Sequence, residues 1–276
     1  MKKQTIFIFI AIAMLSLQCA PRYTDNGNII RIKGSDTMYI LAQSWAENYM
    51  KANPGISIYC EGGGTATGTQ ALASGTVEIS TASRPIRPEE GQLIAQRFNS
   101  VGVMHRVAKD ALSIYIHPSN PVNSLTMEQL KDIYTGKINN WREVGGLSSP
   151  ILKLNRIPNS GTHLYFKEHV MDGEPYTTQG TMVVASAFDM MRNVKINTNA
   201  IGYGGFVNDL EIKLLKVNNV EPLAENVLND TYPITRYLYL YTANVPQGEI
   251  KKFIEWVLGP EGQLLVKQAG FFPLWE

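Results

Sequence analysis

The chain has 276 residues, of which 44% are hydrophobic and 18% are charged. This is an ordinary globular balance, with room for one large domain or two medium ones. The formal net charge of +1 argues against a nucleic-acid-binding protein and against a polybasic protein of membrane surfaces. Any anion site must therefore be local and built from a few placed groups.

The N-terminus has the pattern of a secretion signal. Two lysines precede an apolar run over residues 6–17, which is followed by Cys19 and by a polar stretch. A run this short is typical of a signal peptide and not of a membrane-spanning helix. The cysteine predicts a lipoprotein signal over residues 1–19, with lipid added to Cys19 after cleavage, and a linker over residues 20–28. Gln18 and Ser16 depart from the usual lipoprotein pattern, while ordinary Ala-x-Ala cleavage, the alternative, fits less well still.

Cys60 is the other cysteine of the chain. With Cys19 used for lipid, no intramolecular disulfide is expected in the mature protein. Cys60 ends a predicted strand, so we expect a buried and inert thiol. Beyond the signal, the sequence has no stretch that approaches eighteen apolar residues, so we expect the rest of the chain to be soluble.

The first hundred residues repeat a strand–loop–helix unit. Strands are predicted over residues 28–33, 56–60 and 77–81, and helices over residues 38–52, 69–74 and 88–98. Each of these strands runs into a loop rich in glycine, serine or threonine. This is an α/β pattern with a parallel sheet, whose ligand site is expected beyond the carboxyl ends of the strands.

The rest of the chain continues to mix strands and helices. Strands are predicted over residues 101–107, 111–117, 151–154, 200–206, 213–217 and 233–242. Helices are predicted over residues 125–134, 163–170, 181–192, 250–258 and 261–268, with an irregular loop over residues 135–146. The sequence shows no repeat of solenoid period.

Loops after the strands carry groups suited to a small oxyanion. They are residues 34–37 (GSDT), 64–67 (GTAT), 83–84 (SR) and 156–162 (RIPNSGT). In the last loop Ser160 is a good N-cap, and Gly161 lets the backbone come close to a ligand. The unpaired N–H groups of a helix N-terminus attract an anion. Each loop alone is better explained as a cap or turn, but their recurrence at equivalent places predicts a site for a tetrahedral oxyanion.

The same loops offer no catalytic set. The glycine-rich residues 62–64 lack the Lys-Ser/Thr of a P-loop, and no Gly-x-Ser-x-Gly elbow is present. The histidines, at positions 105, 117, 163 and 169, have no metal-ligand spacing. We therefore expect ligand binding without turnover and without a cofactor or metal.

Several short sequence motifs along residues 29–274 resemble those of a known family. Among them are residues 33–38 (KGSDTM), 82–85 (ASRP), 159–162 (NSGT), 200–203 (AIGY) and 259–263 (GPEGQ). They resemble the PstS-type phosphate-binding proteins of phosphate ABC transporters, in the periplasmic-binding-protein family. The resemblance implies a type II periplasmic-binding-protein fold, an α/β fold of two lobes, each a mixed sheet flanked by helices, with the ligand in the cleft. It implies residues 29–108 plus 235–276 as lobe 1 and residues 109–234 as lobe 2.

The resemblance also implies the ligand residues. They are Ser35 with the neighbouring groups of Asp36 and Thr37, then Thr65, Ser83 and Arg84, and then Arg156, Ser160, Gly161 and Thr162. Some family members have an aspartate where Arg84 stands, and that carboxylate accepts the proton of hydrogen phosphate, which sulfate lacks. Two hypotheses follow: Asp36 takes over as acceptor, or it offsets the two arginines. The alternative is that Asp36 caps the helix that follows it.

The function implied by the resemblance is that of a receptor, not an enzyme. We expect a monomeric lipoprotein, periplasmic or at the cell surface, that delivers inorganic phosphate to the membrane permease of a phosphate ABC transporter. No nucleic acid is expected as a partner. The alternatives are a receptor for another oxyanion, such as sulfate, molybdate or a phosphonate, and a secreted phosphatase; a sensing role beside transport also stays open.

Overall fold

The structure is a computed structural model that describes residues 28–275. The predicted signal peptide, its lipidated Cys19 and residues 20–27 of the predicted linker lie outside the described residues. Between residues 28 and 275, no helix has the length and the apolar character that a membrane crossing requires.

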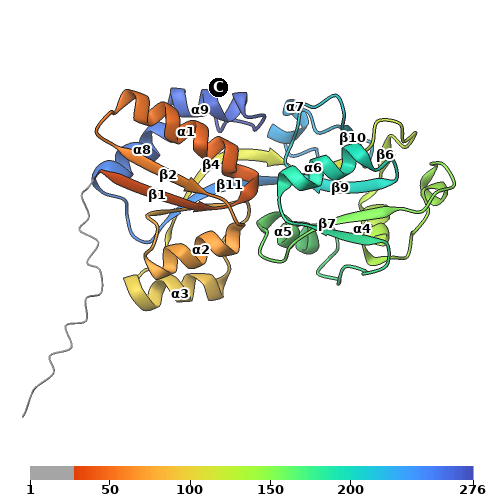
Figure 1. The fold of residues 1–276 in the computed structure, drawn as a ribbon, viewed down its shortest axis with the longest axis horizontal. Coiled ribbons are helices and arrows are strands. Elements are labelled where there is room, and N and C mark those ends of the chain that lie inside the picture. The colour runs from red at the N-terminus through yellow and green to blue at the C-terminus, as the bar shows by residue number, and fades with distance from the viewer. Residues whose placement is uncertain (1–27, 276) are drawn as a thin grey trace, which may run out of the picture.

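Two mixed β-sheets lie side by side along the long axis of the molecule (Figure 1). The first, in the order β2-β1-β3-β11-β4, consists of β1 (Ile29–Gly34), β2 (Ser57–Glu61), β3 (Ile79–Ala82), β4 (Val103–Ala111) and β11 (Thr235–Thr242). The second, in the order β6-β10-β5-β9-β7-β8, consists of β5 (Ser113–Ile116), β6 (Ser124–Leu125), β7 (Leu152–Arg156), β8 (Thr181–Val184), β9 (Ala200–Gly204) and β10 (Lys213–Val217).

Helices flank both sheets. Those of the first sheet are α1 (Tyr39–Ala52), α2 (Thr65–Ser74), α3 (Pro88–Phe98), α8 (Gly248–Leu258) and α9 (Pro260–Gln268). Those of the second are α4 (Met127–Thr135), α5 (Gly161–His169), α6 (Ala187–Ile196) and α7 (Ala224–Leu228). Short 3-10 turns, η1 (Asp36–Met38) and η2 (Trp141–Val144), precede α1 and follow α4. In Figure 1, α1 and α9 lie above the first sheet and α2 and α3 below it. We call each sheet with its helices the first and the second lobe; the predicted α/β fold of two sheets flanked by helices is confirmed.

The helix predicted over residues 181–192 is wrong in its first part. Residues Thr181–Val184 form β8, which pairs in parallel with β7, and the helix begins only at Ala187. Ser186 explains this start, because its Oγ accepts the N–H of Asp189 at 3.0 Å while the Asp189 carboxylate accepts the N–H of Ser186 at 3.2 Å. Such a capping box fixes a helix N-terminus.

Two other boundaries differ from the prediction. Helix α2 begins at Thr65 and not at residue 69, since Gly64, with φ of 96°, ends the preceding loop immediately before it. Strand β4 continues to Ala111, where a break was predicted after residue 107. The remaining predicted elements are found within a few residues of their expected bounds, while β6 and α7 were not predicted.

The chain passes between the two sheets at two adjoining places. It leaves the first sheet at Leu112, between β4 and β5, and returns shortly before β11. The N–H of Leu112 donates to the carbonyl of Ile234 at 2.8 Å, and the Tyr232 hydroxyl donates to the carbonyl of Leu112 at 3.2 Å. The two connections are therefore hydrogen-bonded to each other.

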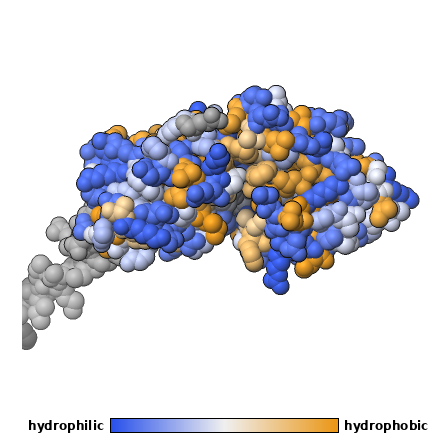
Figure 2. Space-filling model, turned by 90° about the horizontal axis from the view of Figure 1, so that it is seen from above, coloured by the Kyte–Doolittle hydropathy of each residue, from blue (hydrophilic) through white to orange (hydrophobic). Residues whose placement is uncertain are grey.

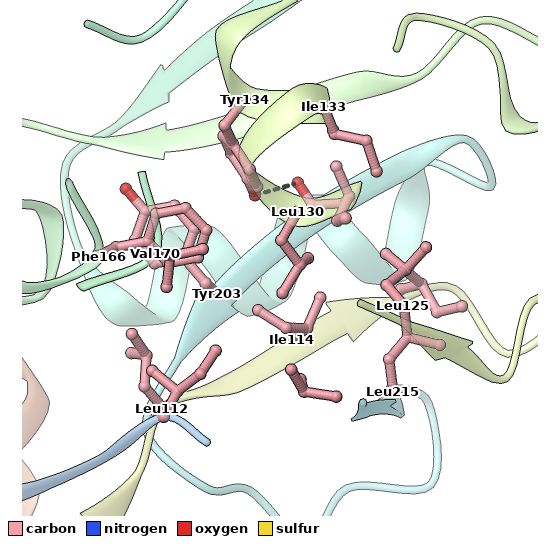
Figure 3. Packing of buried hydrophobic residues seen from close by; sticks show 14 of the residues in the cluster. Leu112, Ile114, Leu125, Leu130, Ile133, Tyr134, Phe166, Val170, Tyr203 and Leu215 are labelled. Atoms are coloured by element: carbon pink, nitrogen blue, oxygen red, sulfur yellow. Dashed lines mark hydrogen bonds between the residues drawn. The ribbon is translucent and has the colours of Figure 1, made fainter. Parts of the chain in front are cut away.

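Each lobe has its own hydrophobic core. In the first lobe, Trp45 is fully buried and its Nε1 donates to the carbonyl of Gly262 at 2.9 Å, which ties α1 to α9. Figure 3 shows the core of the second lobe, formed by residues that include Leu112, Ile114, Leu125, Leu130, Ile133, Tyr134, Phe166, Val170, Tyr203 and Leu215. Burying one such large apolar side chain stabilises the fold by about 1.5–3 kcal/mol. The cores thus hold the strand ends of each lobe in fixed positions.

The surface of the molecule carries hydrophilic and hydrophobic residues. On the face shown in Figure 2, hydrophilic residues cover most of the first lobe, and hydrophobic residues gather near the middle, on the side of the second lobe. Cys60 is half-buried, where full burial was predicted, and burial raises the pKa of its thiol to about 12. A thiol with so high a pKa is unreactive, as expected.

Candidate functional site

The predicted ligand loops of both lobes meet between the two sheets. Ser35 follows β1, Thr65 opens α2, and Ser83 follows β3, whereas Arg156 ends β7 and Ser160 caps α5. All five residues are buried, with 0–3% of each exposed. The carboxyl ends of parallel strands from both lobes thus lie together, where ligands of α/β sheets bind.

Hydroxyl groups of the first lobe lie against the helix N-terminus of the second. Oγ1 of Thr65 accepts the N–H of Ser83 at 3.2 Å, and the two hydroxyls are 3.4 Å apart. Gly161, in the first turn of α5, is so close to them that a Cβ there would lie 2.6 Å from Oγ of Ser83 and would overlap the Thr65 hydroxyl. Only glycine allows this approach.

A second close approach joins Gly64 and Asn159. A Cβ on Gly64 would lie 2.7 Å from the carbonyl oxygen of Asn159. That carbonyl accepts the N–H of Ala66 at 3.2 Å, and the Asn159 side-chain amide donates to the carbonyl of Gly63 at 2.8 Å. The backbones of the two lobes are therefore in direct contact at the site.

Asp36 and Arg156 pair across the lobes. Oδ2 of Asp36 is 2.7 Å from Nη2 of Arg156, and its Oδ1 accepts the N–H of Gly63 at 2.8 Å. Burial lowers the pKa of the Arg156 guanidinium, and the Asp36 carboxylate opposes that shift. Neither contact of the Asp36 carboxylate is with an N–H group of the helix that follows it. Asp36 therefore does not act as the helix cap that was the alternative. This ion pair is the contact that the second hypothesis requires, in which Asp36 offsets the charge of Arg156.

Arg84 is paired with a residue that the sequence analysis did not single out. Nη1 and Nη2 of Arg84 each donate to one carboxylate oxygen of Glu90 at 2.7 Å. Burial alone would raise the pKa of Glu90, but the hydrogen bonds from Arg84 and from the N–H of Arg87 lower it below its usual value. The structure therefore does not bring Arg84 together with Asp36. The Nε atoms of Arg84 and Arg156 are buried and have no hydrogen-bond partner within residues 28–275.

A third arginine, Arg236, was missed by the sequence analysis. It lies on β11 directly opposite Asp110 of β4, and its Nε donates to Oδ2 of Asp110 at 2.9 Å. Burial raises the pKa of Asp110, while the Arg236 charge opposes the shift. Nη1 of Arg236 donates to the Thr162 hydroxyl at 3.0 Å. The signal available in the sequence was a cation within a strand of tyrosines and leucines.

Thr37 and Thr162 complete the contact between the lobes. Their hydroxyl oxygens are 3.0 Å apart, with Thr37 in the turn before α1 and Thr162 in the first turn of α5. The N-terminal turns of both elements therefore face one region. Such turns offer N–H groups and a positive partial charge to an anion.

A cavity of about 600 Å³ lies beside the site. Arg84 and Arg236 line it together with residues of both lobes, among them Arg87 and Glu168. Nη2 of Arg87 is 2.7 Å from Oε1 of Glu168, an ion pair that joins α5 to the segment before α3. Arg84, a predicted ligand residue, and Arg236, which contacts the predicted ligand residue Thr162, thus both line this cavity.

One histidine, His163, lies beside the predicted ligand residues. His163 follows Thr162 in α5, and its Nδ1 lies 3.0 Å from Oδ1 of Asn155. Burial lowers the pKa of His163 to about 4, so the ring is neutral at pH 7. Between residues 28 and 275, no group of three or more His, Cys, Asp or Glu side chains is arranged to hold a metal ion.

Comparison with known proteins identifies relatives of the chain. Residues 21–261 match the family model described as a PBP superfamily domain. The phosphate-binding protein PstS of Bacillus subtilis (strain 168) is 31% identical over 250 residues, which cover 89% of this chain and 80% of that protein.

Two solved structures are similar along nearly their whole length. One, from Clostridium perfringens, is described as a phosphate ABC transporter substrate-binding protein with bound phosphate; its TM-score is 0.82 at 32% identity, over 90% of this chain and 100% of that one. The other is an ABC-type phosphate transport receptor from Vibrio cholerae, with a TM-score of 0.73 at 28% identity, over 88% of this chain and 99% of that one.

Proposed function

The chain belongs to the PBP superfamily and, within it, to the PstS-type phosphate-binding proteins, and from this premise we propose that it is a receptor for inorganic phosphate. The observation that carries the proposal is the meeting of buried hydroxyls, helix N-termini and Arg156 between the two lobes. These groups are donors, and a tetrahedral oxyanion needs many donors at once. The relatives' printed names, which specify phosphate, support the choice of ligand.

The proposed ligand residues are those that the sequence analysis named. They are Ser35, Asp36, Thr37, Thr65, Ser83, Arg84, Arg156, Ser160, Gly161 and Thr162. About eight charge-assisted hydrogen bonds, at roughly 1.5–3 kcal/mol each, exceed the roughly −8 kcal/mol of a micromolar affinity. The difference offsets the cost of dehydrating the ion.

The site balances its own charges. Arg156 is paired with Asp36, and Arg84 with Glu90. Binding must therefore come mainly from directed hydrogen bonds and from the helix N-termini, since the paired cations carry little net charge. Asp36 is the proposed source of selectivity, because a carboxylate accepts the proton of hydrogen phosphate and repels fully ionised sulfate.

The rest of the proposal concerns the setting of the receptor. We propose that residues 29–108 with 235–276, and residues 109–234, close as two lobes on the ion. We further propose that the protein is a monomer, anchored by lipid at Cys19 outside the cytoplasm, and that it delivers phosphate to the permease of an ABC transporter. Delivery to a permease is supported by the names of the two similar structures, which describe them as proteins of ABC-type phosphate transport. Mass spectrometry of the membrane-bound protein tests the anchor, since a Cys19→Ala variant should lack the lipid mass.

Calorimetry on the chain without residues 1–19 tests the function. We expect one phosphate per chain, with micromolar or tighter affinity, and weaker heats for sulfate, molybdate and a phosphonate. Strong binding of sulfate with no heat from phosphate would overturn the proposal. A chromogenic phosphate ester tests the alternative of a phosphatase; turnover that is lost in Arg156→Ala would favour that alternative.

A further inference from the structure

We propose that Arg236 is a positioning residue of the anion site, which holds the Thr162 hydroxyl beside that of Thr37 so that the pair keeps one hydrogen to donate to the ligand. The inference rests on the proposed function, because it assigns a role in binding phosphate. It adds to the site a residue that lies on β11, outside all the predicted ligand loops.

The guanidinium of Arg236 is held at two points. Its Nε donates to Oδ2 of Asp110 at 2.9 Å, and its Nη1 donates to Oγ1 of Thr162 at 3.0 Å. Only 4% of Arg236 and none of Asp110 is exposed. Oδ1 of Asp110 in turn accepts the N–H of Phe206, which follows β9 in the second lobe, at 3.2 Å. The planar fork of arginine suits such a fixed arrangement, unlike a lysine.

The direction of the network follows from the chemistry of the donors. A guanidinium only donates, so the Thr162 hydroxyl must accept from Arg236. The Thr37 hydroxyl lies 3.0 Å from that of Thr162. Two hydroxyls carry two hydrogens, and one of them is used between the two oxygens. The other hydrogen is left to donate outward, so this pair offers a donor to an oxyanion whichever way the inner bond points.

The charge behind Thr162 has a second effect. A hydroxyl that accepts from a cation becomes a stronger donor, because hydrogen bonds in a chain polarise one another. The contact also crosses from β11 of the first lobe to α5 of the second, and the Thr37–Thr162 contact crosses back. A side chain that served only to pair Asp110 would not need to reach the second lobe. The network therefore links strand β11 to α5 and to the turn before α1 at the site.

A double-mutant cycle tests the inference. Phosphate affinity is measured by calorimetry for the wild-type chain, Arg236→Lys, Thr162→Val and the double variant. Lysine keeps a cation opposite Asp110 but does not hold both contacts in one plane. We expect Arg236→Lys alone to weaken binding by about tenfold, the size of one charge-assisted hydrogen bond. In the Thr162→Val background, Arg236→Lys should change the phosphate affinity by no more than about twofold, as expected for residues that act as a unit.

The outcomes separate the inference from the function on which it rests. If the wild-type chain does not bind phosphate, the proposed function fails. If it binds, and Arg236→Lys weakens binding equally in both backgrounds or leaves it unchanged, only the positioning role is overturned. Should Arg236→Lys fail to fold by circular dichroism, the neutral pair Asp110→Asn with Arg236→Gln goes through the same cycle with the same expectation. The matched control is Arg31→Lys, in the ion pair with Glu78 away from the site, and it should leave the affinity unchanged.

Discussion

Asp36 and Arg156 meet across the two lobes, with Oδ2 and Nη2 2.7 Å apart, although 120 positions separate them in the sequence. Arg156 is 2% exposed. A buried ion pair contributes little net stability, but removing one partner leaves an unpaired buried charge. The pair is thus better suited to fix the relation of the lobes and the orientation of the Asp36 carboxylate than to hold the fold together.

Asp36→Asn should reduce the preference for phosphate over sulfate. The amide keeps the shape of the side chain but loses the negative charge, which repels sulfate and accepts a proton. We expect the ratio of the two affinities, measured by competition calorimetry, to fall by about tenfold or more, the size of one charged hydrogen bond. Asp172→Asn, which alters an exposed partner of Lys131, is the control. An unchanged ratio in Asp36→Asn would rule out its role in selectivity.

Gly161→Ala should weaken phosphate binding without weakening the fold. The new Cβ would press on the hydroxyls of Thr65 and Ser83, and overpacking of this kind costs about 1–3 kcal/mol. The lobes can relieve the overlap by staying apart, so the affinity should fall by about 5- to 150-fold. Alanine is the better helix former, so the melting temperature should not fall.

The matched control for that variant is Gly55→Ala. Nothing lies within 4 Å of the position that its Cβ would take. Its affinity should equal that of the wild-type chain. Full affinity in Gly161→Ala would show that the lobes do not need this approach.

His163 should make the fold sensitive to mild acid. Its folded pKa of about 4 lies below the ordinary value of 6.5. The stability that its neutral form contributes is therefore complete above pH 6.5 and is lost as the pH falls from 6.5 towards 4. The free energy of unfolding in urea should fall by up to about 1.4 kcal/mol per pH unit in that window. His163→Asn, whose amide can replace Nδ1, should have a shallower slope between pH 6.5 and 5; equal slopes would contradict the assignment.

Glu90→Gln should destabilise the chain at neutral pH. The change leaves Arg84, whose side chain is 3% exposed, without its charged partner, and a broken buried pair costs about 3–5 kcal/mol. Because the pKa of Glu90 is lowered from 4.5, the contribution is present above pH 4.5 and is lost below it. The difference in the free energy of unfolding between variant and wild type, measured in urea, should therefore become smaller in strong acid.

An exposed glutamate provides the comparison for Glu90. Glu47 pairs with Lys51 one helical turn away, and both side chains are more than half exposed. Glu47→Gln should leave the free energy of unfolding nearly unchanged, because a solvent-exposed ion pair contributes little to stability. A similarly small effect of Glu90→Gln would show that the buried pair with Arg84 is not needed for stability.

The sequence was sufficient for those parts of the site that depend on local chemistry. Ser160 caps α5 through its contact with the N–H of His163. The loop after β1 lies beside Arg156 of the other sheet, as the family resemblance implied for two loops that bind one ligand. Glycines, hydroxyls and helix starts are local signals, so they can be read from a few residues. The arrangement of sheets followed from the resemblance and from the alternation of strands and helices.

Partners distant in the sequence could not be predicted in this way. Asp110 and Arg236 are 126 positions apart, and neither stands in a loop with a recognisable motif. The pairing of Arg84 with Glu90 was open to prediction, since only six positions separate them, but Glu90 was not among the residues considered for the site. For residues 181–184, the β-branched composition and the capping box at Ser186 outweigh the helical spacing that had suggested one long helix.

The position of β11 in the first sheet governs the order in which the chain can fold. This strand is formed by residues Thr235–Thr242, yet it lies between β3 and β4, which come from the first 111 residues. As synthesis proceeds, every strand of the second sheet is available before β11 joins the first. Contacts between distant parts of a chain form slowly, because the intervening loop must close first. The half of the molecule that begins the sequence is thus the last to be completed.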